Sequence, residues 1–137
     1  MNIELRWSHT GNGEENLQFS RVLYAYLHPE SHEVLYLGKA DYSTVQERRR
    51  GPHKDKIFAA IASGERLSVL HAIVGTLYLP EGARYSSELL SDVESLLIIE
   101  LQPRYNEKSK CSRICRPGLM VKCKGDWPTN QKTFHDR

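Results

Sequence analysis

The chain has 137 residues, of which 39% are hydrophobic and 26% are charged, so it is long enough for one domain with a single core. No apolar run is long enough to cross a membrane, and the N-terminus lacks the basic-then-apolar pattern of a secretory signal, so we expect a cytoplasmic protein. The net charge of +2 is unevenly distributed, because residues 102–125 hold seven Lys or Arg and one Asp or Glu. This basic segment suits a polyanionic partner, although a solvated tail would have the same composition.

Two strand-like runs in the first third of the chain predict an antiparallel hairpin, and residues 2–7 before them alternate loosely, as an edge strand would. Residues 21–28 are nearly continuous in strand-forming residues, and residues 34–37 follow a turn-like segment. If the register pairs even-numbered residues with each other, Tyr24 and Tyr36 share one face. Such a pair fits core packing as well as a site. The other face would hold the aliphatic residues Leu23, Ala25, Leu27, Leu35 and Leu37.

The residues after this hairpin are suited to hold a phosphate. Gly38 permits a close approach of backbone or ligand, and Lys39 follows it directly. Ser43 and Gln46 have the spacing of a capping box, which predicts a helix from about residue 44. A strand, a glycine turn with a lysine, and an arginine-bearing helix form a phosphate-binding corner. The arginines of this helix are Arg48, Arg49 and Arg50.

Four further elements are predicted along the chain. A helix is expected over residues 53–63, with Gly64 as its C-terminal stop. Residues 69–79 are apolar on both faces, which indicates a central third strand. A second helix is expected over residues 87–101, and residues 111–125 are expected to form a hairpin.

The helix at residues 87–101 carries a carboxylate beside its apolar stripe. At about 100° per residue, Glu94 lies at the margin of the stripe, where a carboxylate can be oriented and partly desolvated for a metal ion. A single glutamate at such a position is also commonly solvent-facing. Glu100 is a rival, because the same geometry places it nearer the middle of the stripe. The stripe consists of Leu89, Leu90, Val93, Leu96 and Leu97.

In their order and spacing, these pieces resemble the GIY-YIG nuclease family. Val22-Leu23-Tyr24 stands where the family has Gly-Ile-Tyr, and Tyr36-Leu37-Gly38 stands where it has Tyr-Ile-Gly. Arg48 resembles the family's helix arginine, and Glu94 resembles its metal-binding glutamate. The run from Pro103 to Asn106 resembles the family's terminal asparagine motif, with which the nuclease domain of the bacterial excision-repair incision subunit also ends.

The resemblance covers residues 22–106, and it departs from the family pattern at Val22, where the first glycine is missing, and at two Leu-for-Ile positions. It implies an α/β fold with a small, mainly antiparallel three-stranded central sheet flanked by helices. We expect a single domain over residues 1–137, with its core at about residues 20–107, a short N-terminal extension and a basic C-terminal extension over residues 108–137.

The resemblance also implies a divalent-metal-dependent endonuclease that hydrolyses phosphodiester bonds of DNA. Glu94 would hold one Mg²⁺ or Mn²⁺, and Arg48 would clamp the phosphate. Tyr24 or Tyr36, together with Lys39, would orient or deprotonate the attacking water, and which tyrosine does so is left open. The implied catalytic residues are Tyr24, Tyr36, Lys39, Arg48, Glu94, Asn106, which would fix the site through hydrogen bonds, and His53, just beyond the arginine.

Three functional interpretations remain open: a restriction or defence endonuclease, a repair or mobile-element nuclease, and a non-catalytic nucleic-acid-binding module. The compact chain favours the first, and DNA is the expected partner, with RNA left open. A homodimer or a partner subunit is left open as the source of specificity. The residues expected to bind nucleic acid are Arg49, Arg50, Lys54, Arg104, Lys108, Lys110, Arg113, Arg116, Lys122 and Lys124.

The three cysteines do not predict a zinc site. Cys111, Cys115 and Cys123 lack a paired Cys-x-x-Cys spacing, and His135, the nearest additional ligand, lies close to the chain terminus. An odd cysteine count in a chain without a secretory signal favours free thiols.

Overall fold

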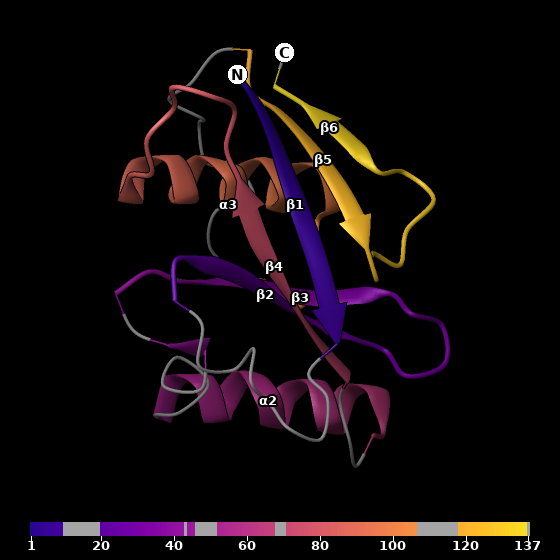
Figure 1. Cartoon of the computed structure of the whole chain (residues 1–137). Coiled ribbons are helices and arrows are strands. Elements are labelled where there is room, and N and C mark those ends of the chain that lie inside the picture. The colour runs from indigo at the N-terminus through magenta and orange to yellow at the C-terminus, as the bar shows by residue number, and fades with distance from the viewer. Residues whose placement is uncertain (10–19, 43, 46–51, 68–70, 107–117, 137) are drawn as a thin grey trace.

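The computed structural model describes residues 1–9, 20–42, 44–45, 52–67, 71–106 and 118–136, and for residues 52–55 it describes the helical backbone only. These residues form an α+β fold with a curled, mixed sheet of order β3-β2-β4-β1-β5-β6 and two helices (Figure 1). No helix in this part of the chain has the length and apolarity needed to cross a membrane. The elements are β1 (Asn2–His9), β2 (Val22–Leu27), β3 (Val34–Ala40), α2 (Pro52–Glu65), β4 (His71–Tyr78), α3 (Ser87–Leu101), β5 (Met120–Gly125) and β6 (Thr133–His135).

The sheet contains six strands rather than the three that the sequence predicted. The predicted unit is present as β2, β3 and β4, which pair in antiparallel fashion with β2 in the middle, and β4 is central as expected. The strand at the N-terminus is not an edge strand, because β1 pairs antiparallel with β4 and parallel with β5. The predicted terminal extensions therefore supply half of the sheet. Local patterns could not show this, since Ile3 pairs with Val121 at the far end of the chain.

The hairpin of β2 and β3 has the predicted even-to-even register over most of its length. Tyr24 pairs with Gly38 and Tyr26 pairs with Tyr36, so the tyrosines share one face. The register shifts after Tyr26, and this irregularity moves Leu35 out of the aliphatic face. Leu35 packs instead with Tyr24, Tyr26 and Tyr36 on the other face, in what we call the tyrosine cluster. This corrects its predicted position.

Helix α2 is longer than predicted because Gly64 does not end it. The helix continues to Glu65, and the left-handed residue that follows is Arg66, with φ of 54°. Gly64 is required for a different reason: a Cβ atom at this position would lie 2.3 Å from the hydroxyl oxygen of Tyr105. The glycine thus lets the segment after α3 pack closely on α2.

Helix α3 has the predicted bounds, Ser87 to Leu101. The hydroxyl of Ser86 caps its first turn by accepting a hydrogen bond from the Leu89 N–H at 3.1 Å. The helix ends at Gln102, which has φ of 48° and donates its N–H to the Ile98 carbonyl at 2.8 Å.

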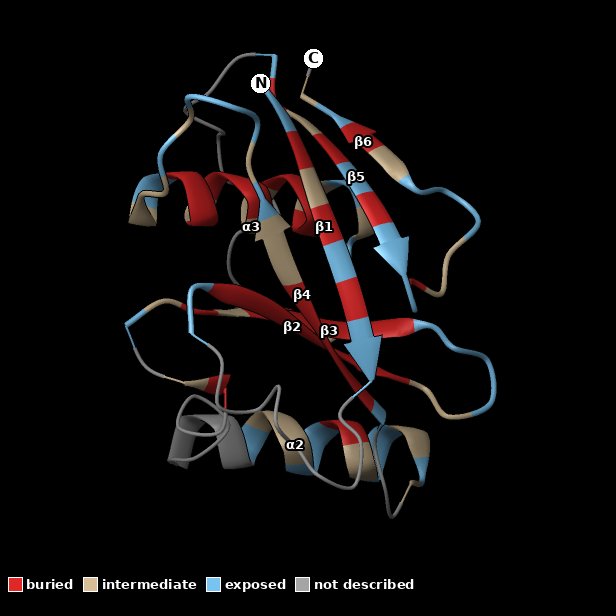
Figure 2. Cartoon of the chain, viewed as in Figure 1, coloured by how far each residue is buried: buried red, intermediate tan, exposed pale blue. Residues whose placement is uncertain are grey.

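The core is divided between the two faces of the sheet (Figure 2). Helix α3 packs on the face that contains Leu23 and Leu37, and this cluster extends to the tryptophan pair Trp7 and Trp127. On the other face, the tyrosine cluster packs against Ile61 of α2. Side chains of the β2–β3 hairpin therefore reach one helix or the other according to whether their residue number is odd or even, except at the irregularity.

Candidate active site

Tyr24 lies against Gly38 in the middle of the hairpin. Tyr24 is only 1% exposed, and a Cβ atom added to Gly38 would come within 2.6 Å of its Cζ atom and 2.7 Å of its hydroxyl oxygen. The close approach predicted at Gly38 is therefore made by the phenol ring on the paired strand. Only glycine leaves this space open.

Three tyrosines, not two, form the aromatic cluster of this face. The ring centroids of Tyr24 and Tyr36 are 6.3 Å apart, and Tyr26 lies 5.9 Å and 5.8 Å from them. Tyr26 also contacts Phe58 of α2 edge-on at 6.1 Å. Sequence reasoning missed Tyr26, although it lies two residues after Tyr24 and therefore on the same face. The cluster is core packing, and Tyr36 at 7% exposure is its least enclosed member.

Lys39 leaves the hairpin on the opposite face and reaches α3. Its Nζ atom donates a hydrogen bond to the Ser91 hydroxyl at 2.5 Å. Ser91 precedes Glu94 by three residues, so both side chains lie on one face of the helix. The structure therefore brings Lys39 toward the Glu94 side of α3 and not toward the tyrosine cluster.

Glu94 is half-buried on α3, as its position beside the apolar stripe predicted. Its rival Glu100 is exposed, although the angular position of Glu100 would place it within the stripe. Burial along α3 ends at Ile98, so position along the helix decides the exposure of Glu100. Of these two glutamates, Glu94 is the one whose surroundings can orient its carboxylate.

The donor set fits Mg²⁺ or Mn²⁺ that is shared with a substrate better than a closed metal site. Within the described ranges, no group of three or more His, Cys, Asp or Glu side chains could hold a metal ion. Mg²⁺ commonly binds through one or two carboxylates, retains several waters and takes the remaining oxygens from phosphates. A single oriented carboxylate at Glu94 meets that requirement.

Asn106 acts as a clamp on the free edge of β3. Its Oδ1 atom accepts a hydrogen bond from the Leu37 N–H at 2.9 Å, and its Nδ2 atom donates to the Leu37 carbonyl at 2.8 Å. The Tyr105 N–H donates to the Leu35 carbonyl at 3.0 Å. These bonds imitate a neighbouring strand and hold the segment after α3 against Tyr36-Leu37-Gly38, 69 residues away in sequence.

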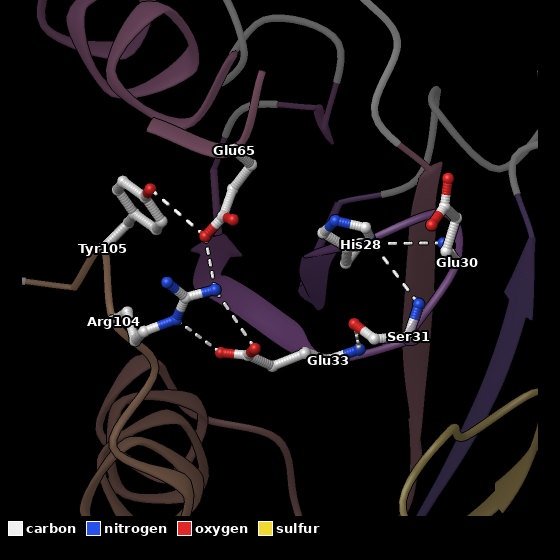
Figure 3. A network of polar contacts seen from close by, with 7 residues as sticks. All are labelled: His28, Glu30, Ser31, Glu33, Glu65, Arg104 and Tyr105. Carbon is white, nitrogen blue, oxygen red and sulfur yellow. Dashed lines mark hydrogen bonds and ion pairs between the residues drawn. The ribbon is translucent and has the colours of Figure 1, made fainter. Parts of the chain in front are cut away.

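Arg104 is held by two carboxylates (Figure 3). Its Nε and Nη2 atoms donate to Glu33 at 2.7 Å and 3.1 Å, and it also pairs with Glu65 at the end of α2. The hydrogen bonds that Arg104 donates to Glu33 raise the pKa of Arg104. The Tyr105 hydroxyl donates to Glu65 at 3.3 Å. Arg104, which we predicted to bind nucleic acid, thus joins the hairpin to α2, and its two ion pairs favour a structural role.

The same figure shows the turn that connects β2 and β3. His28 Nδ1 accepts hydrogen bonds from the N–H groups of Glu30 at 3.1 Å and Ser31 at 3.3 Å. The Ser31 hydroxyl accepts from the Glu33 N–H at 3.3 Å. The turn thereby presents the Glu33 carboxylate to Arg104.

The other predicted nucleic-acid contacts are divided between the described and undescribed parts of the chain. Lys122 is exposed on β5, whereas Lys124 forms an ion pair with Glu4 at 2.8 Å. The side chains of His53 and Lys54 lie outside the described residues. So do Arg48, Arg49, Arg50, Lys108, Lys110, Arg113 and Arg116.

Cys123 is a buried core residue of β5. Burial raises the pKa of its thiol to about 12, so the reactive thiolate is scarce at neutral pH. Cys111 and Cys115 lie outside the described residues, as does the first part of the predicted hairpin, residues 111–117. The strand that does form there, β5, pairs with β1 and β6.

A polar cluster at the start of α3 was not predicted. Tyr85 donates a short hydrogen bond to Asp41. Hydrogen bonds from Ser87 and Tyr85 lower the pKa of Asp41, with smaller contributions from the charges of Lys39 and Arg21. No local pattern indicated this cluster, because Asp41 and Tyr85 come together only when α3 docks on β3.

Comparison with protein-family models, with curated proteins and with solved structures gives no match. The resemblance to the GIY-YIG nucleases stays a prediction from the sequence motifs.

Proposed function

We propose that this protein is a divalent-metal-dependent endonuclease that hydrolyses DNA phosphodiester bonds. The supporting observation is that pieces of the predicted motif meet on one short stretch of β3. Tyr24 packs on Gly38, Asn106 pairs with Leu37, and Lys39 follows on the same strand. Asn106 thereby joins the segment after α3 to the strand that carries Gly38 and Lys39.

The chemistry requires a polarised phosphate, an activated water and stabilisation of the leaving oxygen. Glu94 would hold Mg²⁺ or Mn²⁺, which supplies Lewis-acid activation of the phosphate and a more acidic water when bound. Lys39 would place positive charge beside this carboxylate, and Arg48 would clamp the phosphate. Tyr24 and Tyr36 pack on the face of the sheet opposite α3, so Lys39, rather than a tyrosine, would orient the water at Glu94. Asn106 positions β3 and does not touch the reacting atoms.

A restriction or defence role is the setting that we favour for this activity. A repair or mobile-element nuclease is the alternative within the same activity. Specificity would come from a homodimer or a partner subunit.

One observation favours a second candidate, a non-catalytic nucleic-acid-binding module. Tyr24 and Tyr36 are buried at 1% and 7% exposure in a packed cluster, which limits their access to a substrate water. A binding module would bind nucleic acid equally well with and without a divalent metal, and it would cleave none.

The deciding experiment incubates the purified protein with plasmid, single-stranded DNA and RNA in Mg²⁺, Mn²⁺ or EDTA. The nuclease proposal expects cleavage of DNA that requires metal and stops in EDTA. Binding without cleavage under all three conditions would replace it with the binding module. Absence of both binding and cleavage would remove both candidates.

A further inference from the structure

Tyr42 is the most exposed large aromatic residue in the described part of the chain. It follows the end of β3, and its side chain is 89% exposed. The hydroxyls of Tyr42 and Ser87 share a hydrogen bond at 3.0 Å. The polar tip of the ring is thus tethered to the first turn of α3 while its faces remain in solvent. Aromatic faces held in this way serve as stacking platforms for nucleic-acid bases.

The tether places Tyr42 in line with the proposed active site. Ser87, Ser91 and Glu94 are spaced by four and three residues, so they form one stripe along α3. Ser87 holds Tyr42, and Ser91 holds Lys39. At about 1.5 Å per residue, Ser87 and Glu94 are roughly 10 Å apart along the helix axis.

Two cations lie beside this stripe. The Arg21 N–H donates to the Asp41 carbonyl at 3.2 Å, and the Arg21 guanidinium carbon lies 5.1 Å from the centroid of the Tyr85 ring. Lys39 is the second cation. Asp41 accepts a hydrogen bond from the neutral Tyr85 hydroxyl and keeps its negative charge, so Arg21, Lys39 and Asp41 together carry one net positive charge beside Tyr42. Exposed aromatic surface with flanking positive charge is typical of sites for single-stranded nucleic acid.

Resting on the proposed nuclease function, we infer that Tyr42 stacks on an unpaired base of the DNA substrate, about three nucleotides from the phosphate bound at Glu94. The spacing follows from the axial distance of roughly 10 Å and about 3.4 Å per stacked nucleotide. The base is unpaired because neighbouring pairs cover both of its faces within a duplex. The substrate class is therefore DNA with a single-stranded segment beside the cleaved bond.

The test measures binding and cleavage of a fluorescein-labelled single-stranded oligonucleotide and of a series in which one abasic site is moved along it. Binding is measured by anisotropy in EDTA, and cleavage in Mg²⁺ or Mn²⁺. The variants are Tyr42→Ala, Tyr42→Trp and the matched control Tyr78→Ala. Tyr78 is 45% exposed on β4, and the Arg6 guanidinium lies 3.9 Å from its ring centroid.

We expect Tyr42→Ala to weaken binding about tenfold, Tyr42→Trp to preserve it and Tyr78→Ala to leave it unchanged. In the wild type, one abasic position about three nucleotides from the cut should weaken binding to the same extent, and Tyr42→Ala should be insensitive to it. Loss of binding with Tyr42→Ala but no cleavage in any metal would refute the nuclease and keep the stacking site.

Normal binding and cleavage by Tyr42→Ala would overturn the stacking site and leave the nuclease standing. A change in sedimentation of Tyr42→Ala, with unchanged DNA binding, would show that Tyr42 contacts a second copy of the chain and would also overturn the inference. Failure of the wild type to bind any of these oligonucleotides would overturn the stacking site, and metal-dependent cleavage of plasmid would still leave the nuclease standing.

Discussion

Tyr24 and Gly38 face each other across the β2–β3 ladder, and the Tyr24 ring occupies the space that a side chain at position 38 would fill. The two residues are therefore coupled: the ring needs the glycine, and the glycine would leave a void without the ring. The motifs Val22-Leu23-Tyr24 and Tyr36-Leu37-Gly38 therefore meet at a close-packed pair of residues.

Gly38→Ala should destabilise the protein by about 1–3 kcal/mol, because its Cβ atom would overlap the Tyr24 ring. Thermal or urea unfolding measures the effect. The matched experiment is a double-mutant cycle with Tyr24→Leu, which removes the ring atoms that clash. The cost of Gly38→Ala should become smaller in the Tyr24→Leu background, and simple additivity would contradict the coupling.

Asn106→Asp should destabilise the protein although the two side chains have nearly the same size. The substitution keeps the oxygen that accepts from the Leu37 N–H but puts a second acceptor opposite the Leu37 carbonyl. We expect a loss of about 2–3 kcal/mol at neutral pH, measured by urea unfolding. Asn130→Asp, at an exposed position, is the control and should change little. Equal effects at both positions would argue against the clamp.

Glu94→Gln should abolish cleavage and preserve folding. It keeps the size of the side chain but removes the charge that would hold Mg²⁺, which should cost on the order of a thousandfold or more in rate. Binding should survive, since one carboxylate no longer repels the phosphates. Glu100→Gln on the same helix is the control, and circular dichroism checks folding. If Glu100→Gln is inactive and Glu94→Gln cuts normally, the wrong carboxylate has been chosen.

Arg104→Gln should affect stability and not the salt dependence of DNA binding. Its guanidinium is already paired with Glu33 and Glu65, and at 52% side-chain exposure the network contributes about 1 kcal/mol or less. Denaturation and binding titrations at several salt concentrations separate the two effects. A flatter plot of log K against log salt for Arg104→Gln would return it to the binding surface.

Neutralising other cations of the basic segment should change DNA binding and its salt dependence. Replacing Lys108, Lys110, Arg113 and Lys122 with glutamine should weaken DNA binding. The slope of log K against log salt should become shallower by about 0.7–0.9 for each phosphate that the protein no longer neutralises. Fluorescence anisotropy over a series of salt concentrations measures the slope. An unchanged slope would remove this segment from the DNA-binding surface.

Asp41→Asn should make stability less dependent on pH in acid. The folded-state pKa of Asp41 is lowered, chiefly by hydrogen bonds from Ser87 and Tyr85, so the carboxylate stabilises the fold above its unfolded pKa of about 4. That contribution is lost as the pH falls through the folded pKa. Urea unfolding between about pH 3 and 7 should show a shallower decline for Asp41→Asn and, in part, for Ser87→Ala. Parallel curves for wild type and both variants would contradict this.

The elements with strong local signals were predictable. Helix α3 has its predicted bounds because five apolar residues recur at helical spacing before a left-handed stop at Gln102. The shared face of Tyr24 and Tyr36 follows from strand alternation. The predicted helix end at Gly64 was wrong, because the glycine instead makes room for the Tyr105 side chain. No residue near position 64 in the sequence indicates that Tyr105 packs there.

What could not be predicted depends on contacts between distant segments. The pairing of β1 with β5, the docking of Asp41 on Tyr85 and the pairing of the Arg104 charge with Glu33 and Glu65 are all of this kind. The motif residues were found by their types and spacing, whereas the side of the sheet that each one faces required the structure. Lys39 illustrates this, since its neighbour in sequence packs on Tyr24 while its own amine reaches Ser91.

The parallel pairing of Asn2 with Met120 has a consequence for synthesis of the protein on the ribosome. Strand β1 gains this neighbour only after residues 10–119 have also been made, so the sheet cannot be completed before then. Closing so large a loop is slow relative to local helix formation. Until β5 emerges, the backbone groups of β1 on that side remain available to other chains, and a chaperone that shields strand edges should raise the yield of folded protein.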